Sequence, residues 1–224
     1  MLEVKSINAF YSDFHVLHDA SLTVKKGELI AVVGANGHGK STLLKAICGL
    51  TPIKSGSVSF DGQDTVGRSA PQLVERGLVY VAEDRRLFGD MTVLENLQLG
   101  AYLPAARKLE KRNLDHVFTL YPRLAERQHQ LCRSLSGGEA QMVALGRGLM
   151  SNPTLLAIDE PSLGLAPNLT EIMLKTVSDL NREGLTVLLV EQSLGVLEGM
   201  IDRVYSIEEG MVHENDPEVT KEIA

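Results

Sequence analysis

The segment Leu29–Ser41, LIAVVGANGHGKS, joins an apolar run to the start of a predicted helix. Its first five residues predict a buried strand, and STLLKAICGL predicts a helix that begins near Gly39. The residues between them fit the pattern G-x-x-x-x-G-K-[ST], in which glycines curl the backbone so that N–H groups point at an anion. The positive end of the helix adds to the same place. Because a predicted strand precedes the pattern and a predicted helix follows it, a chance glycine turn is a poor explanation. The loop is therefore predicted to bind a nucleoside triphosphate.

The residues of this phosphate loop are expected to act in different ways. Lys40 would supply a full positive charge for the outer phosphates, and the Ser41 hydroxyl is placed for Mg²⁺. His38 is expected to point its side chain away while its backbone N–H still serves phosphate. The predicted nucleotide-binding residues of the loop and helix start are Asn36, Gly37, His38, Gly39, Lys40, Ser41 and Thr42.

Composition limits the class of protein. The chain has 224 residues, 44% of them hydrophobic, which is enough for one α/β domain or for one domain with an added lobe. A net charge of −7, 4% aromatic residues and no Trp argue against binding to nucleic acid. Cys48 and Cys132 lack metal or C-x-x-C spacing, and we expect free thiols in a reducing compartment. Glu3 and Lys5 interrupt the first apolar residues, and no run is long enough to span a bilayer, so a cytosolic protein without signal peptide is expected.

The order of predicted elements indicates an α/β domain with an inserted helical lobe. Alternating residues at 2–11 and 16–24 predict two antiparallel strands around a turn. From 92 to 130 the pattern is helical, and strands return only at 155. The other expected elements are strands at 57–60, 78–82, 155–158 and 186–190, helices at 71–76 and 169–182, and two strands around a Glu-Gly turn after 202.

A second helix start is also predicted to bind an anion. Ser136 is a favourable N-cap, and Glu139 three residues later completes a capping box. Gly137 and Gly138 leave backbone N–H groups accessible at the same point. Since one nucleotide needs only one phosphate loop, this second start binds either a different ligand or the nucleotide held by another copy.

Acidic and amide side chains follow the predicted buried strands. Asp159 and Glu160 end one strand, and this pair fits a carboxylate for Mg²⁺ followed by a general base that polarises water. Glu83 and Gln192 follow two other strands. Ligands of open α/β sheets bind at such strand ends, although a solvated loop is the simpler alternative.

Two aromatic residues stand at the turn between the first two strands. Tyr11 and Phe14 would, from the residues alone, be a core plug or a surface cap. A ring at this position could instead stack on adenine.

Three motifs together resemble the nucleotide-binding subunits of ABC transporters: GANGHGKS, LSGGE and LLAIDEPSLGL. The resemblance implies a P-loop NTPase (RecA-like) α/β core with an antiparallel β subdomain and an inserted α-helical subdomain. Residues 1–83 and 152–224 would form the core with the β subdomain, and 84–151 the helical subdomain with the signature motif LSGGE. It also implies a head-to-tail dimer in which Ser136, Gly137 and Gly138 of one subunit close on the ATP held by the other.

The same resemblance assigns roles to further residues. Tyr11 falls where an aromatic ring stacks on adenine, and Val16 is counted with it in the nucleotide site. Glu83 falls where most members carry a glutamine that contacts Mg²⁺ and water and senses the membrane partner. Its loop and the helical lobe would form the groove for the cytoplasmic coupling helix of the permease.

Departures from the usual pattern narrow the resemblance. Glu83 replaces glutamine, and Gln192 replaces a histidine that senses the γ-phosphate. Both changes, with EDRRLF, GRGLMSNP, DEPSLGLAP and VLLVEQS, resemble the ATPases of branched-chain amino acid importers. An amide cannot shuttle a proton, so the predicted catalytic residues are Glu160 as base, Lys40, and Gln192 in positioning. Glu83 is predicted to add a carboxylate to Mg²⁺, beside Ser41 and Asp159.

The expected function is therefore ATP hydrolysis with Mg²⁺ that powers amino acid uptake through closure and reopening of the dimer. Expected partners are integral membrane permease subunits, a second ATPase that is identical or related, and, indirectly, an extracytoplasmic solute-binding protein. The protein would lie on the inner face of the cell membrane through the permease. Alternatives are an importer of another solute such as urea or amides, a non-transport ABC ATPase acting on ribosomes or DNA, and a slow nucleotide switch.

Overall fold

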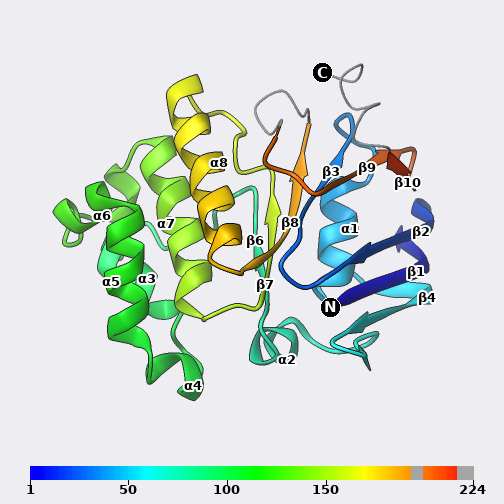
Figure 1. Cartoon of the computed structure of the whole chain (residues 1–224), viewed down its shortest axis with the longest axis horizontal. Helices are drawn as coiled ribbons and strands as arrows, with labels where there is room; N and C mark the ends of the chain where they lie inside the picture. The colour runs from blue at the N-terminus through cyan, green and yellow to red at the C-terminus, as the bar shows by residue number, and fades with distance from the viewer. Residues whose placement is uncertain (193–198, 216–224) are drawn as a thin grey trace.

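The computed structural model describes residues 1–192 and 199–215, and its central element is a six-stranded sheet (Figure 1). The order is β10-β9-β3-β8-β7-β6; all neighbouring pairs are parallel except β10–β9 at one edge. The strands β3, β7 and β8 are buried along their whole length, which explains why they read as continuous apolar runs. The bounds are β3 Leu29–Val33, β6 Leu78–Val81, β7 Leu155–Asp159, β8 Thr186–Glu191, β9 Arg203–Glu208 and β10 Met211–Asn215.

A second sheet of four antiparallel strands lies beside the first, in the order β2-β1-β4-β5. Its strands are β1 Leu2–Tyr11, β2 Phe14–Val24, β4 Ile53–Phe60 and β5 Gln63–Asp64. β4 starts four residues before the predicted strand 57–60, because Ile53 and Ser55 pair with Ala9 and Asn8 of β1. The side chains of this segment carry no strand pattern, so only the pairing reveals it.

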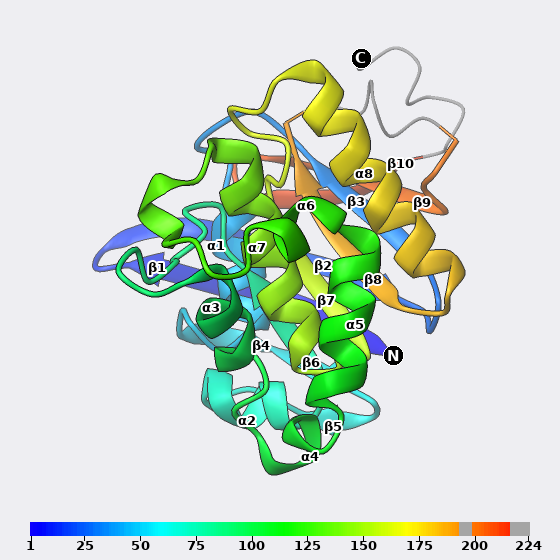
Figure 2. The same ribbon diagram turned by 90° about the vertical axis from the view of Figure 1, so that its left-hand side faces the viewer.

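Three helices of the core and a group of further helices lie around the large sheet. The core helices are α1 Lys40–Ile47, α2 Ala70–Glu75 and α8 Pro167–Arg182. Between β6 and β7 the chain forms α3 Val93–Leu99, α4 Pro104–Arg107, α5 Glu110–Leu120, α6 Pro122–Glu126, the 3-10 helix η1 Cys132–Ser134 and α7 Gly137–Met150. The predicted helical stretch 92–130 is thus four helices, and Pro104 and Pro122 each stand at the start of one. Figure 2 shows α5, α7 and α8 together on the face of the molecule turned toward the viewer.

The core lies on both faces of the large sheet, and β3 shows how the chain divides between them. Leu29, Ala31 and Val33 pack in a cluster with α7 and α8, whereas Ile30 and Val32 pack in the cluster with α1 and the four-stranded sheet. This alternation follows from the period of two in a strand. Because β3 is packed on both faces, its end is fixed relative to both layers. This positions the phosphate loop that follows it.

Three further sequence predictions concern the two cysteines, membrane-spanning helices and the polar end of the chain. Cys48 and Cys132 are free and buried, as predicted. In the part of the chain that the structure describes, no helix has both the length and the apolar character needed to cross a bilayer. The predicted polar end of the chain and the last residue of VLLVEQS lie outside the described residues.

Candidate active site

The phosphate loop connects the end of β3 to the start of α1, and its backbone has the curled form that an anion site needs. Gly37 and Gly39 have φ angles of 85° and 102°, which residues with a side chain rarely adopt. The backbone N–H of His38 donates to Ala35 O at 3.3 Å, and the His38 carbonyl accepts from Gly210 at 3.1 Å. The loop is therefore preformed and held from the β9–β10 turn.

Lys40 is buried in the loop, with 4% of its surface exposed. Its Nζ donates to Gly34 O at 2.7 Å and Ala35 O at 3.1 Å, and it forms an ion pair with Glu160 at 3.0 Å. A buried cation needs such partners, because its desolvation costs several kcal/mol. The charge of Lys40 is thus held at the mouth of the loop by carbonyl oxygens and balanced by one carboxylate.

Ser41, Asp159 and Tyr80 form a chain of hydrogen bonds at the sheet edge. The Ser41 hydroxyl donates to Asp159 Oδ1 at 3.0 Å, and the Tyr80 hydroxyl donates to Oδ2 at 2.7 Å. Burial raises the pKa of Asp159, an effect that these two hydrogen bonds oppose. Burial, followed by the hydrogen bond to Asp159, raises the pKa of Tyr80, so its hydroxyl stays a donor. The two predicted Mg²⁺ ligands, Ser41 and Asp159, therefore lie in contact.

These oxygens fit Mg²⁺ that arrives with a nucleotide. Mg²⁺ is usually held by one or two carboxylates together with substrate phosphates and water. Residues 1–192 and 199–215 contain no group of three His, Cys, Asp or Glu side chains arranged to hold a metal ion by themselves. A hydroxyl and one carboxylate beside a phosphate loop match the first arrangement.

Glu160 directly follows β7 and points back into the site. Its backbone has a φ angle of 44°, and its N–H donates to Val190 O of β8 at 3.0 Å. Only 6% of the residue is exposed. In addition to Lys40, the Gln192 amide donates to its Oε2 at 2.9 Å. The structure thus brings together three residues that were predicted to be catalytic, Glu160, Lys40 and Gln192.

A cleft of about 410 Å³ opens in front of these groups. Tyr11 and Phe14 stand at its rim with 49% and 72% of their surfaces exposed, which excludes a role as core plugs. A hydrogen bond with Thr51 is the main cause that lowers the pKa of Tyr11. The cleft is lined by Tyr11, Phe14, Val16, Asn36, Gly37, Gly39, Lys40, Ser41, Thr42, Glu83, Glu160 and Leu163.

Glu83 reaches the same cleft from the end of β6. Partial burial, and then the negative charges of Glu160 and Asp159, raise its pKa. Two carboxylates that line the cleft, Glu83 and Glu160, with Asp159 buried beside them, favour the entry of a cation. The predicted proximity of Glu83 to the Mg²⁺ residues is therefore present in the fold.

Ser136, Gly137 and Gly138 lie apart from this cleft, at the start of α7. The predicted capping box is formed: Ser136 Oγ accepts from the Glu139 N–H at 3.3 Å, and Glu139 Oε2 accepts from the Ser136 N–H at 3.0 Å. In Figure 1, α7 lies to the left of the large sheet and α1 to the right. Within one copy of the chain, the two anion-binding helix starts do not meet.

Sequence reasoning missed two groups around the site. Tyr80 was placed in a buried strand without a role, although a hydroxyl inside an apolar strand needs a partner and could have signalled one. Arg147 of α7 donates to the carbonyl oxygens of Arg85 and Arg86, each at 2.8 Å, and Arg85 donates to Gln141 at 2.8 Å. The loop that carries Glu83 is therefore bonded to the helix that begins with Ser136.

Comparison with known proteins agrees with this geometry. Residues 17–163 match the family described as ABC transporter. The chain belongs to the ABC transporter family. It is an ATP-binding, ATP-hydrolysing cassette, and the predicted P-loop NTPase (RecA-like) fold with its antiparallel β and helical subdomains is confirmed.

Individual relatives of this ABC cassette cover nearly its whole length. It is 42% identical to the "High-affinity branched-chain amino acid transport ATP-binding protein BraG" of Pseudomonas aeruginosa, over 96% of this chain and 92% of that protein. It is 34% identical to a "Probable branched-chain amino acid transport ATP-binding protein LivF" of Archaeoglobus fulgidus, over 95% of this chain and 90% of that protein.

Solved structures of ABC cassettes share the fold. A nucleotide-free ATP-binding cassette from an ABC transporter superimposes with a TM-score of 0.86 and 29% identity, covering 100% of this chain and 94% of that one. A dimeric bacterial ABC transporter cassette gives a TM-score of 0.84 with 27% identity over 97% of this chain and 99% of the other.

Proposed function

We propose that this chain is the ATPase subunit of an importer of branched-chain or related amino acids. The observation that carries the proposal is the convergence of Lys40, Ser41 and Glu160 on one cleft at the end of a phosphate loop, with Asp159 hydrogen-bonded to Ser41. The names of the relatives from Pseudomonas and Archaeoglobus support the class of solute. The arrangement suits phosphoryl transfer to water, in which positioning and charge stabilisation account for most of the catalysis.

Within the cleft, the chain's own groups have separate roles. Backbone N–H groups from Asn36 to Thr42 and the Lys40 ammonium hold the phosphates, and Tyr11 with Val16 packs on the base. Ser41, Asp159 and Glu83 would hold Mg²⁺, which supplies charge neutralisation on the phosphates when bound. Glu160 orients and polarises the attacking water, and Gln192 positions Glu160 through its 2.9 Å hydrogen bond.

The nucleotide-free chain holds its base in an ion pair. Glu160 pairs with Lys40 at 3.0 Å, and both side chains are more than nine-tenths buried. A phosphate group that enters the loop competes with the Glu160 carboxylate for the Lys40 ammonium. Sharing the ammonium between two anions weakens the ion pair between Lys40 and Glu160. Nucleotide binding thereby releases Glu160 toward water.

A second ATPase subunit, identical or related, completes the site in our proposal. Its Ser136, Gly137 and Gly138 would face the phosphates across a head-to-tail interface, because these residues do not line the cleft of their own chain. Dimeric cassettes among the structural relatives support this arrangement. We further propose the division into a core of 1–83 and 152–224 and a helical subdomain of 84–151.

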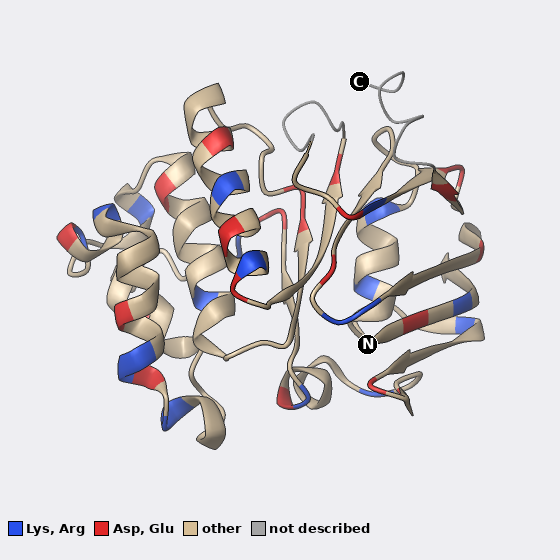
Figure 3. Ribbon diagram, viewed as in Figure 1, with Lys and Arg blue, Asp and Glu red and all other residues tan. Residues whose placement is uncertain are grey.

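The permease would contact the region that follows Glu83. Phe88, Leu99 and Tyr102 expose 56%, 39% and 47% of their surfaces there, all within or beside α3. Such exposed apolar side chains suit the apolar face of a short cytoplasmic helix. Contact with membrane subunits would hold the chain on the inner face of the cell membrane and, through them, link it to an extracytoplasmic solute-binding protein. We propose no nucleic acid partner: Figure 3 shows basic and acidic residues interspersed on the ribbon.

The ATPase rate measured against protein concentration tests the shared site. We expect the rate per subunit to rise with concentration, and Glu160→Gln to dimerise in size-exclusion chromatography only when ATP is present. A concentration-independent rate from a monomer would contradict the role of Ser136–Gly138. Uptake of labelled leucine by cells that depend on this chain, with Glu160→Gln as control, tests the solute; uptake of urea or amides instead would correct it.

A further inference from the structure

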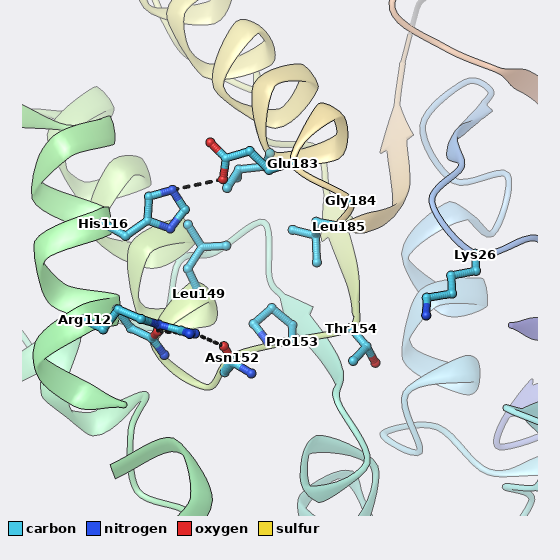
Figure 4. Close-up of a pocket in the computed structure, with 12 residues that line it drawn as sticks. Lys26, Arg112, His116, Leu149, Asn152, Pro153, Thr154, Glu183, Gly184 and Leu185 are labelled. Carbon is cyan, nitrogen blue, oxygen red and sulfur yellow. Dashed lines mark hydrogen bonds and ion pairs between the residues drawn. The ribbon is translucent and has the colours of Figure 1, made fainter. Parts of the chain in front are cut away.

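A second cleft, of about 660 Å³, opens on the edge of the large sheet opposite the nucleotide cleft (Figure 4). Thr154 and Leu185 stand directly before β7 and β8, and Lys26 precedes β3, so the cleft lies where these parallel strands begin. The catalytic groups follow the ends of the same strands. The remaining walls come from α5 and from the last turns of α7 and α8.

Two cations line this cleft without an ion-pair partner. The Arg112 guanidinium donates to the neutral amide oxygens of Asn152 at 2.9 Å and Asn113 at 3.3 Å. Over residues 1–192 and 199–215, no carboxylate oxygen lies within 4.0 Å of a side-chain nitrogen of Arg112 or Lys26. In a chain of net charge −7, cations without a carboxylate partner in one cleft favour an anionic group of a ligand.

One carboxylate faces the same space. Glu183, just after α8, contacts His116 Nε2 at 3.2 Å. Arg112 and His116 are four residues apart on α5 and so lie on one face of the helix, with their Cβ atoms about 6 Å apart. Figure 4 shows Arg112 reaching toward Asn152 and His116 toward Glu183 across the cleft. Glu183 is thus held at His116, one turn of α5 away from Arg112, so that the cleft carries a cation and a carboxylate on different elements.

Between these polar groups the surface is apolar. Figure 4 shows Leu149, Pro153 and Leu185 between α5 and the start of β8, and Leu180 also lines this wall. Leu149 is 8% exposed and Leu180 3%, so the wall is continuous with the core. An inorganic anion would leave this wall without contacts, and a dicarboxylate would meet Glu183 with like charge.

We propose that this cleft binds an aliphatic α-amino acid, with its carboxylate on Arg112, its ammonium on Glu183 and its side chain on Leu149 and Leu185. Such a ligand joins α5 to the end of α8, because its two charged groups contact these different segments, while its side chain packs on Leu149 of α7. Binding itself does not depend on the proposed function. Only a role of the site in sensing the imported solute rests on that function.

Isothermal titration calorimetry of the full chain without nucleotide tests the site, with leucine as the probe. We expect saturable binding of leucine and at least about tenfold weaker binding of 4-methylpentanoate, which lacks the ammonium, and of 3-methylbutylamine, which lacks the carboxylate. Arg112→Gln and Glu183→Gln should each weaken leucine binding by about tenfold or more. Arg182→Gln is the matched control, because this exposed arginine pairs with Asp179 and does not line the cleft.

The proposal has definite contrary outcomes. Absence of saturable leucine binding, an unchanged dissociation constant in Arg112→Gln, or phosphate binding as tightly as leucine would overturn it. Displacement of leucine by ATP would overturn the placement, since the nucleotide cleft lies at the other edge of the sheet. Circular dichroism verifies that the variants are folded, and the ATPase rate, measured separately, distinguishes failure of this site from failure of the proposed function.

Discussion

Replacing Tyr80 with Phe removes a single hydroxyl from the network that holds Asp159. That hydroxyl donates to Asp159 Oδ2 at 2.7 Å, while Ser41 donates to Oδ1 at 3.0 Å. Phenylalanine keeps the ring in its place on β6, so the substitution isolates one hydrogen bond to a carboxylate that is 1% exposed.

The size of the effect follows from the charge of the acceptor. A hydrogen bond to a charged group contributes about 1.5–3 kcal/mol, and we take about 2 kcal/mol for the half-buried Tyr80. For a chain of this length, that loss lowers the melting temperature by about 4–8 °C. Asp159 Oδ1 also becomes less well oriented, so we expect the Mg²⁺ concentration that gives half-maximal ATPase rate to rise by about tenfold.

Two assays test this prediction together: thermal unfolding without nucleotide, and ATPase rate across a Mg²⁺ titration. Tyr102→Phe is the control, because its ring is 47% exposed and no hydrogen bond from its hydroxyl is found in the described part of the chain. At saturating Mg²⁺ we expect the ATPase rate of Tyr80→Phe to change by less than the roughly tenfold change in Mg²⁺ requirement, since Glu160 keeps its contacts with Lys40 and Gln192. An unchanged melting temperature together with an unchanged Mg²⁺ requirement would refute the reasoning.

Three further predictions follow from the geometry. Lys40→Met leaves the Glu160 carboxylate buried and unpaired, so it should lower the free energy of unfolding, measured in urea, by about 3 kcal/mol. Adding Glu160→Gln should restore most of the lost stability. A double variant as unstable as Lys40→Met would contradict the ion pair. Glu83→Gln should raise the Mg²⁺ requirement of the ATPase about fivefold, about 1 kcal/mol, and an unchanged requirement would remove Glu83 from the site. Burial is the largest single effect on Glu28 and acts to raise its pKa. The Arg203 guanidinium at 2.8 Å and the backbone N–H and charge of Lys25 together outweigh it, so the pKa lies below the ordinary 4.5. The stabilisation by this pair is therefore present at neutral pH and is lost as the pH falls below about 4.5. The melting temperatures of wild type and Arg203→Met should converge in acid. A difference in melting temperature that stays constant with pH would contradict a stabilising ion pair.

Local rules explain why much of the fold could be predicted from the sequence. The phosphate loop depends on glycine conformations and on one strand–helix junction, and the capping box of α7 depends on residues three apart. Asp159, Glu160 and Gln192 could be placed at one edge because parallel strands end together. Each of these inferences uses neighbours in the chain or the direction of a strand.

The groups that sequence reasoning missed depend on which strands are neighbours. Tyr80 reaches Asp159 because β6 pairs with β7 in a register that sets Tyr80 opposite Ala157, and the sequence does not state this order. Arg147 meets Arg85 across 62 residues, and the second cleft combines α5 with the starts of β7 and β8. Such contacts have no local pattern, since only the packing of whole elements creates them.

The ion pair of Lys40 with Glu160 gives a physical reason why the proposed enzyme would stay inactive without its complete assembly. In the free chain the carboxylate is held by Lys40 at 3.0 Å and by Gln192 at 2.9 Å, and so has little freedom to accept a proton from water. Phosphate in the loop weakens the first contact but leaves the far side of the nucleotide open, because Ser136 stands at the start of α7, away from the cleft. The proposed mechanism would then require two conditions in sequence: ATP displaces the carboxylate, and a second subunit closes over the phosphates. In this proposal hydrolysis would be tied to dimer closure, which is the motion that could be transmitted to a permease.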